Sequence, residues 1–224
     1  MDIRIEAWGR TDYWYSLEQQ HQARERIIQE PQASGLIAVT EHQPVVTIGK
    51  TGNRKNLKRA PNELRALGIA FFQTDRGGDV TYHGPGQATI YPIINLKALG
   101  MGLREYLRNL ESVGIDFFRT YGVAVETRKG FTGLWTDGSK IASIGIGVRQ
   151  WVTRHGISLN IRTQQTGFQW IVPCGIPGCT VTSLEETGQR TPNPLEAGMD
   201  YAERLKAFLQ NKTKTEADEM DHNA

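Results

Sequence analysis

Hydrophobic and polar side chains alternate along some stretches of this chain and recur at a helical spacing along others. Residues 2–8 alternate, which is typical of a strand with one buried face. Tyr13–Gln29 has helical spacing, with Thr11 or Asp12 as the N-cap. The inward side of that helix would carry Trp14, Leu17, Ala23 and Ile27. Further strands are predicted at Gly35–Thr40, Val45–Ile48, Ile69–Gln73, Ala88–Ile94, Val123–Glu126, Ile141–Val148 and Ile157–Ile161, and further helices at Pro61–Leu67, Leu103–Tyr121 and Leu195–Leu209.

The order of these elements favours one fold class. Strands outnumber helices and do not alternate with them regularly, so we expect an α+β protein with a mixed β-sheet flanked by helices. A chain of 224 residues fits one ordinary domain, or at most two small ones. There is no internal repeat and no linker-like composition before the acidic end. We therefore expect a single domain over residues 1–210 and an acidic, disordered tail over 211–224.

Composition narrows the class of protein. Hydrophobic residues make up 38% and charged residues 22%, which excludes wholesale disorder. Two cysteines exclude a disulfide framework and a four-cysteine zinc site. The first ten residues mix acids and bases, unlike a signal peptide. Apolar stretches such as Ile141–Val148 fall well short of the roughly 18 residues that a membrane helix needs. We expect a soluble protein of a reducing compartment, most simply the cytoplasm.

Charge is distributed unevenly along the chain. The net charge is +2, but Thr215–Ala224 carries four acids and no lysine or arginine, so the remainder has 26 bases against 20 acids, or +6. One basic cluster has no acid among residues 50–60, and it is either a solvated loop or a docking surface for an acidic carrier or an anionic substrate. It consists of Lys50, Arg54, Lys55, Lys58 and Arg59.

The first segment that could bind a ligand or take part in a reaction is Asp75–Pro92, DRGGDVTYHGPGQATIYP. Its glycines would let the backbone approach a ligand closely. The spacing of a phosphate loop before a Lys-Ser/Thr pair is absent. Arg76 and His83 flank the glycines and could bind a polar head group, whereas on structure alone the segment is a turn between two strands.

The second segment is Gly138–Asn160, GSKIASIGIGVRQWVTRHGISLN. Lys140 opens an apolar strand, so it is either a solvated edge charge or points into a cleft. The strand beginning near His155 would pair with the first as an antiparallel hairpin, which would bring Lys140–Gly145 near Gly156–Asn160. His155 itself fits a structural role better than a catalytic one.

The third segment is Ile171–Leu184, IVPCGIPGCTVTSL. Cys174 lies between proline and glycine, which indicates an exposed turn. A free cysteine is usually buried and inert, so on chemistry alone a structural role for Cys174 is the more common case. Cys174 is nevertheless a candidate nucleophile, and Cys179 competes for that role. A zinc site is disfavoured because further thiolates are absent.

Together the strings RGGDVTYHGPGQ, KIASIGIGVRQWVTRHGISLN and VPCGIPGCTVTSL resemble the three signature blocks of the lipoyl(octanoyl) transferases, in the same order. The resemblance spans residues 2 to about 210. It implies the fold of the biotin and lipoate ligases. It also implies transfer of an octanoyl group from octanoyl-acyl carrier protein to a specific lysine of lipoyl domains, those of 2-oxoacid dehydrogenase complexes and the glycine-cleavage H protein. This is the first step of endogenous protein lipoylation.

The resemblance also assigns residues. Cys174 matches the acyl-accepting cysteine and Lys140 the lysine that assists it, while Cys179 matches no functional position. The stretches that match the lining of the substrate pocket are Arg76, Gly77, Gly78, Asp79, Val80, Thr81, Tyr82 and His83, then Ser143, Ile144 and Gly145, then Gly156, Ile157 and Ser158.

These residue types suit that chemistry. Converting a thioester to an amide is downhill, so no ATP, metal or cofactor is required. A cysteine thiol with the ordinary pKa of about 8.5 is only a few per cent thiolate at pH 7, so an adjacent cation such as the Lys140 ammonium would enrich the nucleophile. Neutral Lys140 could later take the proton of the incoming amine, with His83 as the rival base. Backbone N–H groups near Cys174-Gly175 or Gly77-Gly78 could stabilise the oxyanion. On the strand Ile141–Val148, the face with Ser143, Gly145 and Gly147 would leave room for the acyl chain.

Three other classes share some of these features. An ATP-dependent lipoate or biotin ligase would have the same fold without needing Cys174. A cysteine hydrolase would pass the acyl group to water, and a non-catalytic carrier-binding protein would keep only the basic cluster and the glycine loop. Intact Lys140 and Cys174 favour the transferase.

Overall fold

The computed structural model describes residues 2–30, 35–163 and 165–221. Its strands are β1 (Ile3–Thr11), β2 (Gly35–His42), β3 (Val45–Ile48), β4 (Ala70–Gln73), β5 (Val80–His83), β6 (Gln87–Ile93), β7 (Glu126–Arg128), β8 (Phe131–Thr136), β9 (Ser139–Arg149) and β10 (Val152–Asn160). Its helices are α1 (Tyr13–Gln29), α2 (Pro61–Ala66), α3 (Leu103–Arg119) and α4 (Pro194–Asp221), with short 3₁₀ turns η1 (Arg54–Asn56), η2 (Gln165–Trp170), η3 (Pro173–Gly175) and η4 (Glu185–Thr187).

The strands form two sheets. The large sheet has the order β1-β2-β6-β10-β9-β8-β7, and the small one the order β4-β3-β5. In both, one pair is parallel, β1 with β2 and β3 with β4, and the other pairs are antiparallel. Both sheets are therefore mixed; the mixed character was expected, whereas the second sheet was not.

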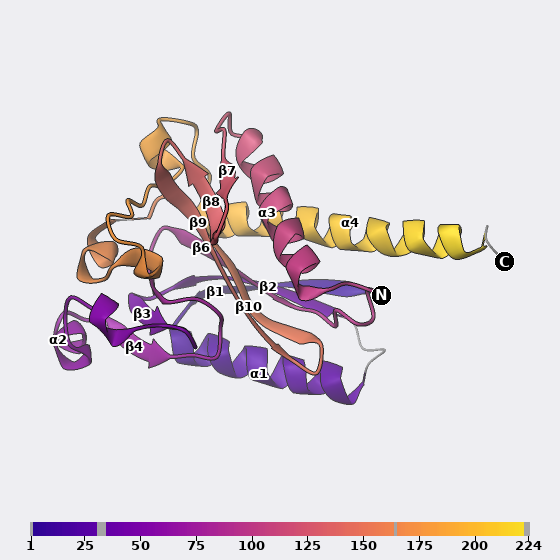
Figure 1. Cartoon of the computed structure of the whole chain (residues 1–224), viewed down its shortest axis with the longest axis horizontal. Coiled ribbons are helices and arrows are strands. Elements are labelled where there is room, and N and C mark those ends of the chain that lie inside the picture. Colours follow the sequence, from indigo (N-terminus) through magenta and orange to yellow (C-terminus); the bar gives the residue numbers. More distant parts are fainter. Residues whose placement is uncertain (1, 31–34, 164, 222–224) are drawn as a thin grey trace.

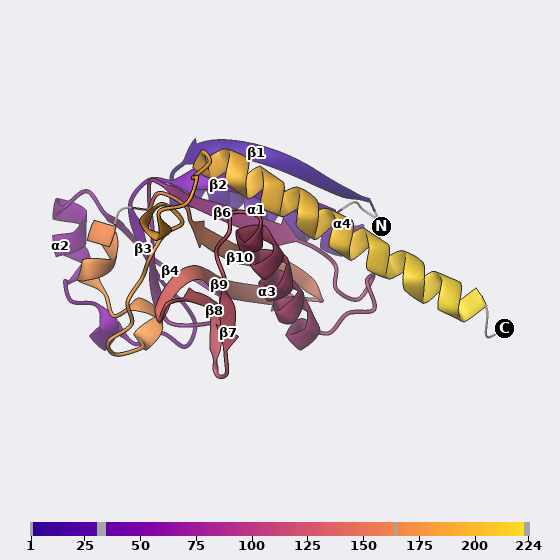
Figure 2. The ribbon, with the colours of Figure 1, turned by 90° about the horizontal axis from the view of Figure 1, so that it is seen from above.

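Helices cover both faces of the large sheet (Figures 1 and 2). Helix α1 packs on β2, β6 and β10, and its Ile27 is buried with Leu36 and Tyr91. On the opposite face α3 and α4 pack against each other and over the sheet, where Ile37 and Ile90 join the main core. Because both faces of the sheet are covered, every residue of β2 and β6 is buried, including polar ones such as Thr40 and Gln87.

The local signals in α1 were mostly accurate. The helix spans Tyr13–Gln29 as predicted, and the Asp12 carboxylate caps it by accepting from the Tyr15 backbone N–H. The prediction for Trp14 was wrong, because its side chain is 62% exposed. The buried side instead carries Tyr13, Ser16, Gln20, Arg24 and Ile27.

Four other differences from the sequence-based assignment concern the strands and the C-terminal helix. The strand predicted at Val123–Glu126 is instead β7, which begins at Glu126 and ends at Arg128. The strands β2 and β3, joined by the predicted turn, belong to different sheets. The short strands β5 and β8 were not predicted. Helix α4 continues to Asp221, well beyond the expected end at Leu209, so the division of the chain at residue 210 stays a prediction.

Leu205 on α4 provides a test of the core packing. Its side chain is fully buried in the main core, so Leu205→Ala should lower the free energy of unfolding by about 2–5 kcal/mol. Denaturant titration measures the change. Glu203→Ala, an exposed position on the same helix, is the control and should differ from wild type by less than about 0.5 kcal/mol. Equal stability of both variants would show that α4 does not contribute to the core in this way.

Candidate active site

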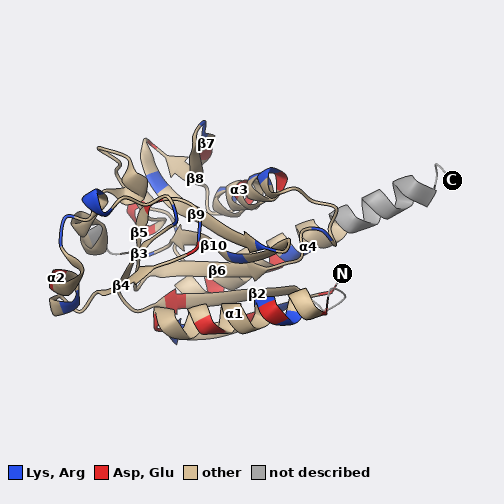
Figure 3. Ribbon diagram, turned by 60° about the horizontal axis from the view of Figure 1, so that its bottom comes forward, with Lys and Arg blue, Asp and Glu red and all other residues tan. Residues whose placement is uncertain are grey.

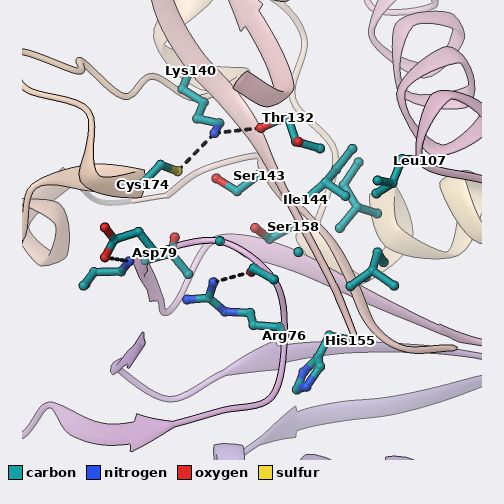
Figure 4. Close-up of a pocket in the computed structure, with 18 of the residues that line it drawn as sticks. Arg76, Asp79, Leu107, Thr132, Lys140, Ser143, Ile144, His155, Ser158 and Cys174 are labelled. Atoms are coloured by element: carbon teal, nitrogen blue, oxygen red, sulfur yellow. Dashed lines mark hydrogen bonds between the residues drawn. The ribbon is translucent and has the colours of Figure 1, made fainter. Parts of the chain in front are cut away.

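A cavity of about 350 Å³ lies where β5, the β9–β10 hairpin, α3 and the η3 turn meet. Figure 4 shows Lys140 and Cys174 at one end, with Ser143 and Ser158 between them and the apolar pair Ile144 and Leu107. The cavity thus has a reactive end beside an apolar compartment.

Lys140 and Cys174 are in direct contact. The Lys140 Nζ atom donates to Cys174 Sγ at 3.0 Å and to the Thr132 carbonyl at 2.9 Å, and it lies 5.1 Å from the centre of the Trp135 ring. Lys140 is only 3% exposed. The alternative of a solvated edge charge was therefore wrong, and the lysine points into the cavity. The Lys140 amino group thus has a sulfur, a carbonyl oxygen and an aromatic face as its neighbours.

Backbone pairing brings these two residues together across 34 positions of sequence. The Lys140 N–H donates to the Thr180 carbonyl and the Lys140 carbonyl accepts from the Thr182 N–H, both at 2.9 Å. This parallel bridge, Lys140 with Val181, fixes the segment that follows Cys174 along the start of β9. The contact thus depends on a short non-local pairing beside the sheet.

The backbone of the Cys174 turn adopts an unusual conformation. Cys174 has φ of 56° and Gly175 has φ of 68°, both in the left-handed region. Such a conformation costs a non-glycine residue about 1–2 kcal/mol, so the surroundings must hold it. A side chain at Gly175 would place its Cβ atom 2.3 Å from the Asp79 carboxylate. The backbone of the turn therefore packs directly against Asp79.

Asp79 lines the cavity, but its carboxylate oxygens already have partners. Oδ1 accepts from the backbone N–H groups of Asn53 and Val80, and Oδ2 accepts from the Asn56 amide at 2.6 Å. The Asn56 carbonyl in turn accepts from the Val172 N–H at 2.8 Å. Asp79 thereby joins the loop after β3 to the segment that leads into Cys174.

Nearly all residues assigned by resemblance line this one cavity. From the glycine segment these are Arg76, Gly77, Gly78, Asp79, Val80, Thr81 and His83, together with Ser143, Ile144, Gly145, Gly156, Ile157 and Ser158. Tyr82 is the exception, because its ring packs in the core of the small sheet against Phe168. Alternation along β5 explains this: Tyr82 points to the face opposite its neighbours Thr81 and His83.

The predicted hairpin is confirmed with its register. Ser158 pairs with Ser143, Ile157 with Ile144 and Gly156 with Gly145 across β9 and β10. The role expected for the small-residue face needs correction. A Cβ on Gly145 would lie 3.0 Å from the Gly77 carbonyl, and one on Gly147 would lie 3.2 Å from the Asp75 carbonyl. The small residues thus accommodate the glycine segment itself rather than leaving an open face.

Arg76 is a buried cation in the wall of the cavity, 7% exposed. Its guanidinium donates to the Thr47 hydroxyl, the Thr47 carbonyl and the Gly77 carbonyl at 2.9–3.2 Å. Burial lowers the pKa of Arg76, mainly through desolvation. These contacts make Arg76 part of the frame that fixes the glycine segment.

Several lining residues were not predicted. They are Tyr13, Thr89, Tyr91, Leu103, Leu107, Gly130, Phe131, Thr132, Ile146, His155 and Ile176. Phe131 and Thr132 were missed because β8 was not recognised. Leu103 and Leu107 show helical spacing that a core residue would also show, so only tertiary packing places them here.

Three buried histidines lie in or beside the cavity, and burial lowers the pKa of each. Desolvation lowers the pKa of His42 to about 4, of His83 to about 3 and of His155 to about 4. His83 Nδ1 hydrogen-bonds to Gln87 Oε1 at 2.6 Å, and its ring stacks on Tyr13. Cys174 makes its side-chain hydrogen bond to Lys140 and not to His83, so the geometry favours Lys140 as its partner.

Asp75, in the loop between β4 and β5, contacts both β10 and α1. Its carboxylate hydrogen-bonds to His155 Nε2 at 2.7 Å and to Arg154, both on β10, and pairs with Arg24 on α1. The hydrogen bond from His155, followed by that from Arg154, holds the pKa of Asp75 well below its usual range. This hydrogen bond fits the structural role expected of His155, although its ring also lines the cavity.

Two absences hold for the described part of the chain. Residues 2–30, 35–163 and 165–221 contain no group of three or more histidine, cysteine, aspartate or glutamate side chains arranged to bind a metal ion. Over the same ranges, none of the helices combines the length and apolar character of a bilayer-spanning segment.

The arrangement defines a class of fold. The structure aligns with a lipoate-protein ligase A bound with ATP, with a TM-score of 0.71 and 12% identity, covering 98% of this chain and 94% of that one. It also aligns with the biotin protein ligase of Aquifex aeolicus, with a TM-score of 0.50 and 11% identity, covering 96% and 71%. The fold is that of the lipoate and biotin ligases, as the sequence resemblance implied.

Sequence comparison identifies the family within that fold. Residues 12–205 match the lipoyl protein ligase A/B catalytic domain. The octanoyltransferase of Clostridium kluyveri is 41% identical over 177 residues, 79% of this chain and 72% of that protein. The chain therefore belongs to the lipoyl protein ligase A/B catalytic-domain family and, within it, to the octanoyltransferases.

The buried histidines predict a pH dependence of stability. Between about pH 6.5 and 4 these histidines are protonated in the unfolded chain but remain neutral in the folded chain. The free energy of unfolding should therefore fall as pH falls through this window. Each histidine contributes a slope of up to about 1.4 kcal/mol per pH unit. Asp75, whose pKa is lowered in the fold, stabilises the protein above about pH 4, and that contribution is lost at lower pH.

Chemical denaturation of wild type and His42→Gln between pH 7 and 4.5 tests this. The variant should show a shallower slope, by up to about 1.4 kcal/mol per pH unit. His21→Gln, an exposed position on α1, is the control and should keep the wild-type slope. A wild-type slope in His42→Gln would contradict the assignment of His42 as a neutral buried group.

Proposed function

We propose that this chain moves an octanoyl group from octanoyl-acyl carrier protein to a lysine of lipoyl domains, through a thioester on Cys174. The acceptors would be lipoyl domains of 2-oxoacid dehydrogenase complexes and the glycine-cleavage H protein. Membership of the octanoyltransferases supports the reaction. The observation that carries the mechanism is the 3.0 Å contact between Lys140 Nζ and Cys174 Sγ at the end of a cavity.

The first half-reaction loads the enzyme. The Cys174 thiolate attacks the octanoyl thioester carbonyl, a new C–S bond forms, and the donor thiol leaves with a proton from the Lys140 ammonium. The neighbouring ammonium favours the thiolate, which is the reactive form of cysteine. The acyl group remains a thioester, so its later transfer is still downhill.

The second half-reaction restores the starting state. The amine of the acceptor lysine attacks the Cys174 thioester, an amide forms, and Cys174 leaves as thiolate. Neutral Lys140 takes the proton that the amine loses and becomes an ammonium again. Both half-reactions then use one dyad, with general acid–base help typically worth about 10²–10⁴-fold.

The backbone hydrogen bonds limit which of the candidate N–H groups could stabilise the oxyanion. The Gly175 N–H already donates to the Val172 carbonyl and the Gly77 N–H to the Ile146 carbonyl. Within the described chain, the N–H groups of Cys174 and Gly78 have no such acceptor, so we assign the oxyanion to them. A structure of the acyl adduct with its carbonyl oxygen beyond 3.5 Å from both would exclude them.

Leu107 and Ile144 are suited to hold the acyl chain. They face each other across the apolar part of the cavity (Figure 4). Burying a methylene is worth about 0.8 kcal/mol, so an eight-carbon chain supplies several kcal/mol of binding. We place the chain between α3 and β9.

The basic cluster at residues 50–59 adjoins the segment that leads into Cys174. Lys58 N–H donates to the Trp170 carbonyl, and Leu57 forms a bridge with Ile171. The loop carries its positive charges before α2 (Figure 3). All five basic side chains are exposed, and Arg59 pairs with Glu63. This surface suits an acidic acyl carrier protein whose thioester must reach Cys174.

A cytoplasmic location is part of the proposal. The mechanism requires Cys174 as a thiol, and both cysteines are unpaired in the structure. Reducing conditions keep such thiols available.

The acyl-enzyme predicts a specific mass change. Mixed with octanoyl-acyl carrier protein and no acceptor, wild type and Cys179→Ala should each gain one octanoyl group in intact-mass spectra, and Cys174→Ala should gain none. Adding a lipoyl domain should then discharge the label, whereas a hydrolase would lose it to water alone. Modification of the lipoyl domain only with octanoate and ATP would identify a ligase instead.

Lys140→Ala should reduce turnover by about 10²–10⁴-fold, because it removes the group that moves the proton in both half-reactions. Turnover is measured as octanoylation of a lipoyl domain, alongside the thermal midpoint of unfolding. Lys129→Ala, an exposed lysine in the β7–β8 turn, is the control and should retain wild-type turnover. Near-normal turnover of Lys140→Ala would exclude the dyad.

Reversing charge at Lys55 and Lys58 tests the docking surface. The double change to glutamate should slow acylation of Cys174 at low salt and have less effect at high salt, since salt screens exposed charges. Lys97→Glu with Lys206→Glu makes the same change in net charge at positions outside the cavity lining. An equal effect of both pairs would assign the change to net charge alone.

A further inference from the structure

Glu111 on α3 is a buried carboxylate that the dyad chemistry above does not use. Its side chain is 3% exposed, although the helix that carries it has a polar outer face. Burying a carboxylate costs several kcal/mol unless hydrogen bonds compensate. Oε2 accepts from Arg108 at 2.8 Å, and Oε1 accepts from the Gly133 backbone N–H at 3.2 Å.

The bond to Gly133 connects Glu111 to Lys140 through one peptide group. The Gly133 N–H and the Thr132 carbonyl belong to the same planar unit, and that carbonyl accepts from Lys140 Nζ at 2.9 Å. Lys140 Nζ in turn contacts Cys174 Sγ. A continuous series of hydrogen bonds therefore runs from the carboxylate through the peptide and the ammonium to the sulfur.

We propose that Glu111 is a positioning residue for the Lys140–Cys174 dyad, acting through the Thr132–Gly133 peptide. The inference rests on the proposed function of that dyad. A carboxylate on the N–H side of a peptide polarises it and makes its carbonyl oxygen a stronger acceptor. The Thr132 carbonyl then holds the ammonium more firmly in place beside the sulfur.

The backbone at Gly133 packs closely against the Lys140 side chain. Gly133 has φ of 123°, a conformation that favours glycine. A Cβ there would lie 2.7 Å from Lys140 Cε, 3.3 Å from Lys140 Nζ and 2.5 Å from the Ala142 carbonyl. The peptide is therefore pressed against the lysine, and a shift of the peptide would move Lys140.

Other charged or titratable groups around this series come from several elements, and replacing Glu111 removes the ion pair of one of them, Arg108. Arg128 lies over the Trp135 ring at 4.5 Å, and burial, Tyr106 and Glu111 raise the pKa of Tyr201 on α4. The remaining neighbours are Arg104, Glu105 and Arg108 around Glu111, and Arg76, Asp79 and Cys179 around Cys174.

The test measures the reactivity of Cys174 directly, in a Cys179→Ser background. The rate of alkylation by iodoacetamide is followed from pH 5 to 10 in Glu111→Gln and Glu111→Ala. Glu111→Gln keeps the size and an acceptor oxygen but removes the charge. It should lower the rate at pH 7 by about 3- to 10-fold and move the midpoint of the pH profile to higher pH, since tenfold corresponds to one pH unit.

Asp116→Asn is the matched control, because it also converts a carboxylate on α3 to an amide, but at an exposed position paired with Arg119. It should keep the wild-type rate and midpoint. A wild-type pH profile in Glu111→Gln would overturn the proposal and leave Glu111 with a structural role, as a partner of Arg108 and of the Gly133 N–H. Should Glu111→Ala fail to fold, Glu111→Gln decides the question.

Alkylation requires neither donor nor acceptor, so this result is independent of the acyl-transfer assay. If wild-type Cys174 takes up no octanoyl group, the proposed function fails whatever the pH profile shows. If Cys174 is acylated and Glu111→Gln keeps the wild-type profile, only the positioning role fails. When the role holds, octanoyl transfer by Glu111→Gln should fall in parallel with the alkylation rate.

Discussion

The contact between the Lys140 ammonium and the Cys174 sulfur requires several segments to be in place at once. A lysine that is 3% exposed is tolerated only if its N–H groups find acceptors and its charge is compensated. The Thr132 carbonyl from β8, the sulfur from the η3 turn and the ring of Trp135 supply these contacts. The contacts of Lys140 therefore fix the positions of β8, β9 and the η3 turn relative to one another.

The same principle governs the rest of the cavity wall. Arg76 is held by Thr47 on β3, and Asp75 by His155 on β10 and Arg24 on α1. Each of these groups is ionisable and lies mostly out of water, and each finds its partners on an element distant in sequence. Misplacing α1 or β10 would leave the buried Arg24 or Arg154 without its carboxylate partner, and losing one partner of a buried ion pair typically costs about 3–5 kcal/mol. The polar contacts therefore specify one arrangement of the two sheets and the helices.

The strands β9 and β10 show most clearly what the sequence could predict. Their alternation predicted both strands and a hairpin, and the register that follows brings Ser143 opposite Ser158. The same reasoning missed β5 and β8, because each is short and lies among glycines that indicate turns. Missing β8 also hid Thr132, whose backbone carbonyl has no signature in the sequence. The exposure of Trp14 was misjudged because its helix buries Ser16, Gln20 and Arg24 instead of a purely apolar stripe.

By itself, the sequence determined the mixed α+β class and the family and singled out Lys140 and Cys174 as candidates, because these inferences rest on local periodicity and on strings of adjacent residues. Only the tertiary structure decided that Lys140 is buried against Cys174, that Tyr82 packs in the core of the small sheet and that Glu111 reaches the Thr132–Gly133 peptide. The physical reason is that these relations depend on non-local pairing, such as the Lys140–Val181 bridge, and on backbone groups that every residue type shares.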